Sequence, residues 1–199
     1  MGRLLRQKRR QLFLSERFVI YVITTGGYRD GFVAPPVEGL EVHVLQSEQD
    51  VEYLVAAGYE DVRRVMRPAG HQLRSGAIGF CAFVKRDVAH IAWVATTADA
   101  KLAIDSVPYL VGFADGEACW GGAYTVGRFR GKGLHGHVME WRLRYCDEHG
   151  YRVVVGATNV DNAPSLRNQA KYGPRVRAQG RYRRVLRWSS WTEECQEDV

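Results

Sequence analysis

A glycine-rich turn near the middle of the chain stands between a candidate strand and a candidate helix. The strand covers residues 117–125, and the turn reads R-G-K-G-L-H-G over residues 130–136. At such a junction, successive backbone N–H groups converge with the positive end of the helix dipole, so the turn can hold a pyrophosphate without a dedicated cationic side chain. Gly131, Gly133 and Gly136 would let the phosphates approach the main chain. We therefore predict a phosphate-binding turn.

Two other nucleotide-binding turns match this segment poorly. The P-loop requires G-x-x-x-x-G-K-[ST], and Lys132 is followed by Gly133, so that signature is absent. The glycines match the dinucleotide fingerprint G-x-G-x-x-G, which belongs in the first β-α-β unit with an acid about 20 residues later. Here the motif comes late in the chain, and the next strand ends at residues 156–157 without an acid. Both nucleotide folds are disfavoured.

Strands and helices are predicted upstream of the turn. β-branched and aromatic residues favour a strand over residues 17–25, and alternation favours another over residues 40–45. Ser47, with Asp50 three residues later, is typical of a helix that starts in a capping box. Apolar residues then recur at helical spacing up to Pro68. The pattern predicts a strand followed by one or two helices.

A hairpin and a long helix frame the turn. Two apolar stretches, 77–84 and 90–95, flank the polar residues 85–87, which predicts the hairpin. The helix is predicted up to Gly150 by apolar residues at one helical face, namely Leu134, Val138, Trp141 and Tyr145.

Three further elements close the chain. Residues 153–155 form an apolar run typical of a buried strand, and Asn162 with Pro164 predicts a short helix that ends near Gly173. The arginine-rich residues 176–188 predict one or two closing strands. Several strands precede the long helix and a β-α-β-α-β order follows, so a mixed α/β or α+β class is expected.

The glycine turn resembles motif A of the GNAT (N-acetyltransferase) acyltransferase superfamily, Arg/Gln-x-x-Gly-x-Gly/Ala. Residues 130–135 read R-G-K-G-L-H, so His135 replaces the usual small residue and Gly136 follows it. The likeness continues at residues 162–173, N-A-P-S-L-R-N-Q-A-K-Y-G, where the family has its second cofactor-contacting helix and Pro174 replaces the usual Phe. The resemblance covers about residues 40–188.

The resemblance implies a GNAT-like splayed mixed β-sheet flanked by helices, with an extra amino-terminal strand and a basic arm. Residues 1–38 would form the arm and the added strand, and residues 39–199 the acyl-CoA-binding domain, in one globular unit. The donor would be acetyl-CoA or a longer acyl-CoA, and the acceptor a primary amine of a small molecule or amino acid. The implied cofactor-binding residues are Ala123, Thr125, Arg130, Gly131, Lys132, Gly133, Leu134, His135, Asn162 and Ser165.

Glu117 is the candidate general base. Acyl transfer to an amine requires the neutral amine, so a proton acceptor is needed before or during attack. Glu117 lies thirteen residues before Arg130, where histone-modifying members of the family carry a base glutamate. Apolar neighbours Cys119 and Trp120 would raise its pKa toward that task. The alternative is a solvated turn acid that follows Asp115.

Other groups are candidates for proton transfer. The family's leaving-group tyrosine falls on Gln169 here, so Tyr172, Tyr124 or solvent would protonate the thiolate. His90 lies in an apolar strand, where a hydrogen-bonded core histidine is favoured over a base. His135 and His137 open the long helix, and we expect a phosphate-side contact and an exposed residue, respectively.

Charge is concentrated at the two ends of the chain. Residues 1–17 carry six basic groups and one acid, residues 175–187 carry six arginines and no acid, and the tail after Trp191 carries four acids. This pattern suits an anionic partner. It leaves two alternatives open: an enzyme resembling N-acyl amino acid synthases, with acyl carrier protein as donor, and a non-catalytic module for nucleic acid or a membrane surface. The lack of a recognised reader motif disfavours nucleic acid.

Composition excludes several protein classes. The chain has 199 residues with 46% hydrophobic and 25% charged composition, as expected of an ordinary globular domain. The stretch 12–23 is interrupted by polar residues and is shorter than the roughly 20 apolar residues of a membrane span. No signal peptide is recognisable, so we expect a cytoplasmic protein. The four cysteines form no C-x-x-C pair, so we expect reduced, mostly buried thiols and no metal site.

Overall fold

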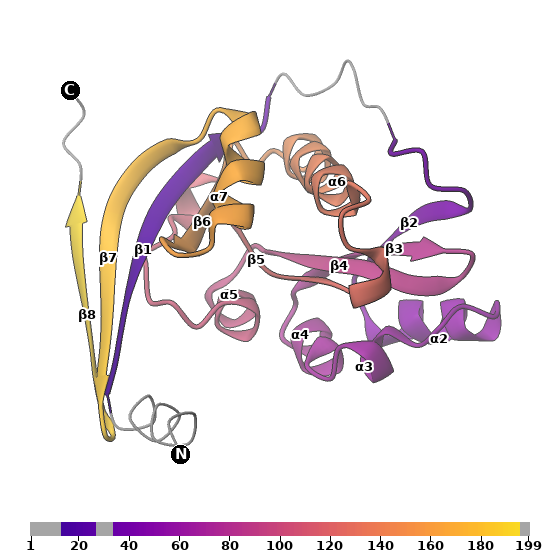
Figure 1. The fold of residues 1–199 in the computed structure, drawn as a ribbon, viewed down its shortest axis with the longest axis horizontal. Coiled ribbons are helices and arrows are strands. Elements are labelled where there is room, and N and C mark those ends of the chain that lie inside the picture. The colour runs from indigo at the N-terminus through magenta and orange to yellow at the C-terminus, as the bar shows by residue number, and fades with distance from the viewer. Residues whose placement is uncertain (1–12, 27–33, 196–199) are drawn as a thin grey trace. The chain divides into compact units, whose positions relative to one another are not determined.

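A computed structural model describes residues 13–26 and 34–195 (Figure 1). The described chain forms two compact units. The first, called the central unit, contains residues 24–26, 34–106 and 111–154; the second, the terminal unit, contains residues 13–23, 107–110 and 155–195. The basic arm of residues 3–10 and the end of the acidic tail lie outside the described residues. The predicted domain division at residue 38 stays a prediction.

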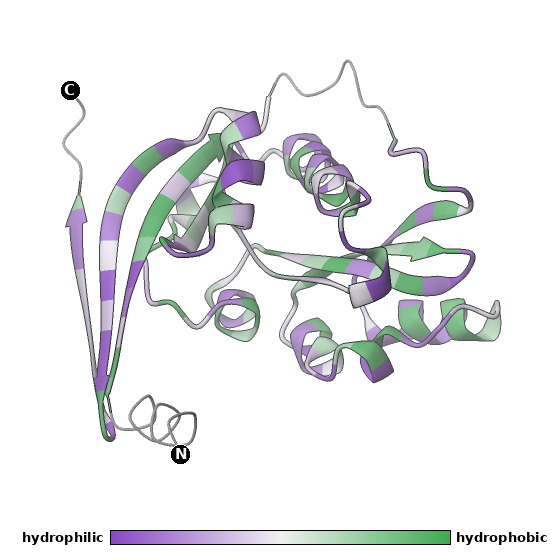
Figure 2. Ribbon diagram, viewed as in Figure 1, coloured by the Kyte–Doolittle hydropathy of each residue, from purple (hydrophilic) through white to green (hydrophobic). Residues whose placement is uncertain are grey.

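The central unit contains four antiparallel strands in the order β2-β3-β4-β5. They are β2 (Leu40–Leu45), β3 (Ile78–Val84), β4 (Asp87–Ala95) and β5 (Glu117–Thr125). Residues 88–95 of β4 are all buried, because strands lie on both edges of β4 and helices cover both faces (Figures 1 and 2). A continuous apolar strand is the pattern expected for a strand that is buried on both faces.

Helices lie on both faces of this sheet (Figure 1). One face carries α2 (Glu48–Ala56), α3 (Val62–Val65), α4 (Ala69–Arg74) and α5 (Ala98–Ile104), and the other carries α6 (Leu134–Glu148). The capping box predicted for α2 is confirmed: the Ser47 hydroxyl accepts from the Asp50 backbone N–H, and the Asp50 carboxylate accepts from the Ser47 N–H at 2.8 Å. Such reciprocal caps satisfy backbone donors that the first helical turn leaves unpaired.

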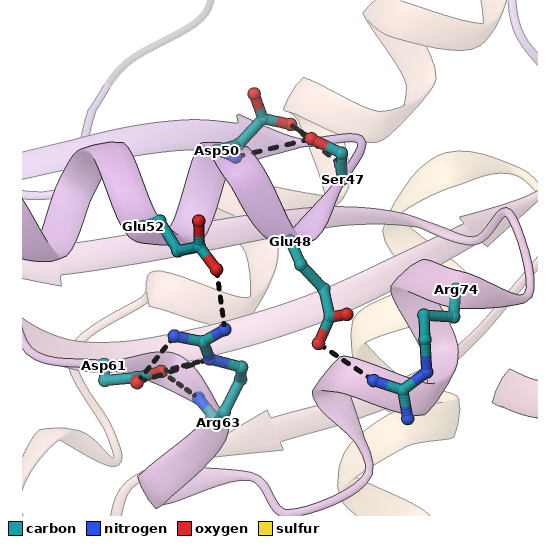
Figure 3. Close-up of polar contacts among 7 residues, drawn as sticks. All are labelled: Ser47, Glu48, Asp50, Glu52, Asp61, Arg63 and Arg74. Atoms are coloured by element: carbon teal, nitrogen blue, oxygen red, sulfur yellow. Dashed lines mark hydrogen bonds and ion pairs between the residues drawn. The ribbon is translucent and has the colours of Figure 1, made fainter.

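Ion pairs link the early helices of the central unit (Figure 3). The Arg63 guanidinium donates to Asp61 at 3.0 Å and thereby lowers the pKa of that carboxyl, and it reaches Glu52 of α2 at 3.9 Å. Arg74 of α4 contacts Glu48 of α2 at 2.9 Å. Partly exposed pairs of this kind contribute about 0–1 kcal/mol each. They orient the helices, whereas burial of apolar residues holds them on the sheet.

The terminal unit has strands in the order β6-β1-β7-β8. These are β6 (Val153–Asn159), whose first two residues belong to the central unit, β1 (Phe13–Thr24), β7 (Arg175–Val185) and β8 (Trp188–Cys195). The short helix α7 (Ala163–Gln169) continues into a 3-10 turn over Ala170–Tyr172. β7 pairs antiparallel with β1 on one side and with β8 on the other. Gly180 of β7 lies under the Trp191 ring, where a Cβ atom would overlap the indole.

Most elements agree with the sequence-based predictions, and the expected α/β class with a mixed sheet and flanking helices is confirmed. β1 begins at Phe13 rather than residue 17, because its first residues pair with the end of β7. The closing arginine-rich stretch forms a hairpin whose second strand reaches Cys195. Helix α5 was not predicted, since seven residues are too few to establish a helical period.

The thiols match expectation. Cys81, Cys119 and Cys146 are buried and Cys195 is exposed, and no disulfide joins the cysteines. Burial raises the pKa of the Cys146 thiol to about 12, which leaves it protonated and inert at neutral pH.

Candidate functional site

The glycine turn of the central unit is anchored at both ends by buried side chains. Phe129, in a short 3-10 turn, and Leu134, the first residue of α6, pack with Ala89 in one apolar cluster. The four residues between them, 130–133, are all exposed. Anchored ends and an exposed middle hold the main chain of this turn in one position while leaving it accessible.

The backbone of the turn requires glycine at two positions. Gly131 and Gly133 have φ of +75° and +78°, the left-handed region in which a Cβ is strained. Gly133 is the N-cap residue of α6, so the helix begins without a capping side chain, and its first turn contains no acid. Helix α6 thus presents the positive end of its dipole at an accessible turn, an arrangement suited to an anion.

Three cationic side chains surround the turn. Arg130 donates from Nε to the Thr125 carbonyl oxygen at 3.2 Å, which ties the turn back to the end of β5. Arg128 lies over the Phe129 ring and pairs with Asp87 at 2.9 Å. The Lys132 ammonium also lies over the Phe129 ring, 5.5 Å from its centroid. The cations add favourable electrostatics for a phosphate group without being required to contact it.

A hollow of about 750 Å³ adjoins the turn. Its walls combine apolar residues with the glycine turn and two lysines. The residues that line it are Pro35, Pro36, Val37, Glu38, Val84, Lys85, Gly131, Lys132 and Gly133. This hollow can take part of a ligand that extends beyond the turn.

A β-bulge interrupts β5 upstream of the turn. Trp93 of β4 pairs with Gly121 and Ile91 pairs with Tyr124, so two residues of β5, 122 and 123, oppose a single residue of β4. Gly122 has φ of +57°, and a Cβ there would lie 2.8 Å from Cδ1 of Trp93. A bulge leaves the extra residue outside the regular ladder. The exposed main chain after Gly122 is therefore available to an extended ligand.

Two neutral histidines lie behind the last residue of β5. His90 Nδ1 is 2.7 Å from the Thr125 hydroxyl oxygen, and the rings of His90 and His135 lie 5.2 Å apart, edge to face. Burial, with His135 and Arg142 as weaker causes, holds the pKa of His90 well below its usual value. Burial and then Arg142 lower the pKa of His135 to about 4. The predicted core role of His90 is confirmed.

His137 corrects one sequence-based expectation. It was expected to be exposed, but only 8% of its surface is accessible. Helical geometry explains the difference, because His137 follows Leu134 by three residues and precedes Trp141 by four, on the face that packs inward. Burial lowers its pKa.

Arg142 is a buried cation that the sequence pattern does not predict. Its Nη1 donates to the Trp93 carbonyl oxygen at 3.4 Å, and its guanidinium lies 4.8 Å from the centroid of the Trp120 ring. The side chain, 3% exposed, thus joins α6 to both β4 and β5. An arginine inside an amphipathic helix gives no distinct sequence signal, since arginine is common on the solvent face of helices.

Glu117 lies at the opposite end of β5 from the glycine turn. It is half-buried, and its Oε2 accepts the Gly112 backbone N–H at 2.7 Å. It is therefore no fully solvated turn acid. Tyr124 is exposed just after the bulge. In the central unit, Tyr124 joins Ala123, Thr125 and residues 130–135 at one end of β5, and Glu117 stands about 16 Å of strand before the bulge.

The remaining predicted residues belong to the terminal unit. Asn162 is the N-cap of α7, and its Oδ1 accepts the Ser165 backbone N–H at 3.3 Å. Gln169 is buried and donates to the Thr158 hydroxyl at 2.7 Å and the Ser165 hydroxyl at 3.0 Å. An amide in these contacts has no acidic proton for a leaving thiolate. Tyr172 is buried in the 3-10 turn after α7.

The part of the chain that the structure describes contains neither a cluster of metal-ligating side chains nor a helix of membrane-spanning character. No cluster of three or more His, Cys, Asp or Glu side chains within residues 13–26 and 34–195 could hold a metal ion. Among the helices of that same part of the chain, none is long and apolar enough to cross a membrane.

Comparison with known proteins identifies the fold. No protein-family model and no curated protein matches the sequence. A GCN5-related N-acetyltransferase from Sphaerobacter thermophilus is similar at 13% identity and a TM-score of 0.55, over 94% of this chain and 57% of that one. A tandem GNAT protein from the clavulanic acid biosynthesis pathway reaches 17% and 0.57, over 92% and 55%. A GCN5-related N-acetyltransferase from Kribbella flavida reaches 15% and 0.52, over 92% and 62%.

These likenesses concern the fold alone. The chain has the fold of the GCN5-related N-acetyltransferases, as the resemblance in the sequence implied. It spans between 55% and 62% of the length of the three proteins compared.

Proposed function

We propose that this chain, with its GNAT fold, is an acyl-CoA-dependent N-acyltransferase that acts on a primary amine of a small molecule or amino acid. The observation that carries the proposal is the glycine turn: left-handed glycines, an uncapped helix N-terminus and exposed main chain, directly after a bulged strand. Each feature serves a ligand that has a diphosphate and an extended arm, as coenzyme A has.

The residues present fit such a donor. Backbone N–H groups of residues 130–135 would hold the diphosphate, with Arg130 and Lys132 adding positive charge. At and directly after the bulge, the main chain of Ala123 and Thr125 would hydrogen-bond the pantetheine arm. The family resemblance also implies Asn162 and Ser165, in the terminal unit, as cofactor-contacting residues.

The reaction would be a direct transfer in a ternary complex. The amine nitrogen forms a bond to the thioester carbonyl carbon, the carbon–sulfur bond breaks, and one proton leaves the nitrogen while the thiolate gains one. The products are an amide and coenzyme A. Holding both reactants together converts an encounter in solution into a reaction within one complex. The chain would contribute mainly this positioning, together with proton transfer.

Glu117 is our candidate for the proton acceptor. Its carboxylate is held by the Gly112 N–H through Oε2, so the group has a fixed position on the strand that leads to the bulge. A fixed, half-buried carboxylate can accept a proton from an amine either directly or through one water molecule. His90 fits this role less well, because its side chain is 1% exposed and cannot reach the amine substrate unless the residues around it move.

For the leaving thiolate, Tyr124 is favoured over Tyr172. Tyr124 is exposed on β5 next to the bulge, in the same unit as the glycine turn. Its hydroxyl would donate a proton to sulfur and recover one from solvent. Tyr172 is buried and would need to become accessible first.

Isothermal titration tests the proposal. The protein, titrated with acetyl-CoA and separately with a longer acyl-CoA at low salt, is expected to bind at least one of them with one site per chain. Absence of binding to both would refute the assignment. Where binding is found, transfer to a panel of small amines and amino acids, followed by release of the coenzyme A thiol, tests the reaction itself.

A further inference from the structure

One face of β1, β7 and β8 is exposed over three rows of paired residues, counted from the hairpin turn. Strand pairing places residues of β1, β7 and β8 in rows, and the side chains of one row share a face. We call one of the two faces the arginine face. Its rows are Phe13–Val185–Trp188, Ser15–Arg183–Ser190 and Arg17–Arg181–Thr192, followed by Val19–Gln179–Glu194.

The first row is apolar and lies at the tip of the β7–β8 hairpin. Phe13 is 57% exposed, Val185 47% and Trp188 83%. Leu186, in the hairpin turn, is 61% exposed. Large apolar side chains do occur singly on protein surfaces, but a contiguous row at one end of a sheet marks a contact surface.

The next two rows are cationic. Arg17 and Arg181 are directly opposite each other, and Arg183 is two residues along β7. Like charges in opposite positions of a strand pair are destabilising. Within the described residues, none of these three guanidinium groups makes an ion pair. The arrangement therefore costs stability, and no acid of the described chain pairs with these arginines, as expected if an external anion relieves the repulsion.

The opposite face of the same strands packs differently. Phe18 and Trp191 lie there with ring centroids 6.1 Å apart, and the Trp191 indole N–H donates to Glu193 at 3.0 Å. These aromatic residues are half-buried, unlike Phe13 and Trp188. The strands thus have a self-packed face and a face whose apolar row is not covered by any other part of residues 13–26 and 34–195.

The hairpin turn keeps a leucine where glycine would be easier. Leu186 has φ of +55°, a conformation that strains any residue with a Cβ. A two-residue hairpin turn requires a positive φ, so the fold imposes this conformation on Leu186. Here the strained position presents an apolar side chain beyond the end of the apolar row.

We propose that the hairpin tip and the arginine face form a peripheral docking surface for an anionic lipid bilayer. The apolar groups of the tip would enter the interfacial layer, with Trp188 at the boundary that tryptophan prefers, and the arginines behind would contact lipid phosphates. The sequence before Phe13 adds five basic groups over residues 3–10. The proposal does not depend on the acyltransferase function.

The distribution of residues favours a bilayer over other anionic partners. Successive rows lie about 7 Å apart along the strands, so the apolar row and the two arginine rows are ordered by distance from the tip. A bilayer has the same order, with acyl chains beneath phosphates. Single-stranded nucleic acid would require aromatic rings interleaved with the arginines. An acidic protein such as acyl carrier protein would bind the arginines but would leave the apolar side chains of the hairpin tip exposed to water.

Vesicle flotation with the full chain tests the proposal. We expect binding to phosphatidylcholine vesicles that contain phosphatidylserine, and weak binding to phosphatidylcholine alone. Each surface arginine is worth about fivefold in partitioning, so Arg181→Ser with Arg183→Ser should weaken binding by about 25-fold. Arg64→Ser with Arg67→Ser, on exposed positions of the central unit, removes the same charge and should change binding far less.

Tip variants separate the bilayer from the other partners. Trp188→Ser and Leu186→Gly should both weaken vesicle binding, and circular dichroism of Leu186→Gly, in which the left-handed strain is relieved, should be that of the wild type. A blue shift of tryptophan fluorescence on vesicles should disappear in Trp188→Phe. Failure to bind anionic vesicles, or binding that tip variants leave unchanged, would overturn the proposal, and so would preferential binding of single-stranded DNA or acyl carrier protein.

Discussion

The glycine turn of the central unit and the hairpin tip of the terminal unit both contain left-handed backbone, but they use opposite residues for it. At the turn, Gly131 and Gly133 adopt φ of +75° and +78°. At the tip, Leu186 adopts φ of +55°. Glycine removes side chains where a ligand must reach the main chain, whereas a strained leucine presents a side chain. In these two regions, the left-handed residue therefore exposes the main chain at the glycine turn and a side chain at the hairpin tip.

The two regions also differ in how they are held. The glycine turn has buried Phe129 and Leu134 at its ends, so its N–H groups are fixed in place before any ligand arrives. The hairpin tip ends a ribbon whose arginine face is solvated. Prepositioned main-chain donors suit a small ligand of fixed shape. An exposed ribbon suits an extended surface.

The largest effect is expected from Gly133→Asp. The carboxylate would stand at the N-terminus of α6, where the diphosphate should bind, and the side chain would strain a left-handed residue. We expect loss of acyl-CoA binding in isothermal titration. Gly150→Asp is the matched control, because Gly150 has φ of +79° and open space around it at the other end of α6. If the folded Gly133→Asp protein binds like wild type, the turn does not hold the donor.

The second largest effect concerns proton transfer by Glu117, the first residue of β5. Glu117→Gln keeps an oxygen for the Gly112 N–H but cannot accept a proton, so kcat should fall by about 10²–10⁴-fold with little change in donor affinity. The deficit should narrow as pH approaches the pKa of the amine, since more acceptor then arrives deprotonated. The comparison requires pH profiles of kcat/KM for both proteins. Equal rates throughout would assign the proton to water or to another group.

The stability of the central unit should depend on pH through His135. His135 has a folded pKa of about 4 against an ordinary value near 6.5, so the unfolded chain binds the extra proton first as pH falls. The stability that depends on neutral His135 is complete above pH 6.5 and is lost toward pH 4. Between pH 7 and pH 5, the free energy of unfolding of the wild type should therefore fall by about 2 kcal/mol more than that of His135→Gln.

Urea unfolding of both proteins at the two pH values measures this difference. His71→Gln, at an exposed position of α4, is the control and should leave the difference between the two midpoints close to that of wild type. If His135→Gln loses as much stability as wild type on acidification, another buried group, such as His90, carries the dependence.

The smallest effect is expected at the hairpin tip. Leu186→Gly and Leu186→Ala both remove the exposed side chain, but only glycine relieves the left-handed strain. Leu186→Gly should therefore be more stable than Leu186→Ala by about 1 kcal/mol. Chemical denaturation of the two variants measures the difference. Equal stabilities would mean that the turn can relax, and the argument from strain at the tip would fail.

Features encoded by local periodicity could be predicted from the sequence. Patterns among residues that are close in sequence predict three elements: the strand before the glycine turn, the helix after it and the hairpin around residues 85–86. The burial of His90 could be predicted for the same reason, because it lies in a continuous apolar run. Local patterns thus identified the elements and the candidate turn.

Features that depend on pairing between distant strands could not be predicted. The bulge at Gly122 becomes visible only when β5 is aligned with β4, and the rows of the arginine face only when β1, β7 and β8 are aligned. The arginines of β7 were recognised as a charged stretch, yet their position opposite Arg17 depends on the register of a strand far away in sequence. The burial of His137 was missed because this histidine lies between Leu134 and Trp141 on the inward face of α6, and a polar residue in that position gives no apolar signal.

Hydrogen–deuterium exchange with and without coenzyme A tests the central claim most directly, because it observes the backbone N–H groups themselves. If the glycine turn holds the donor, amides of residues 130–136 should exchange more slowly in the presence of saturating coenzyme A. The amides of residues 123–125 should also exchange more slowly. The hairpin amides of residues 185–188 should not change. Saturating coenzyme A that leaves residues 130–136 exchanging as fast as in the unbound protein would contradict the account.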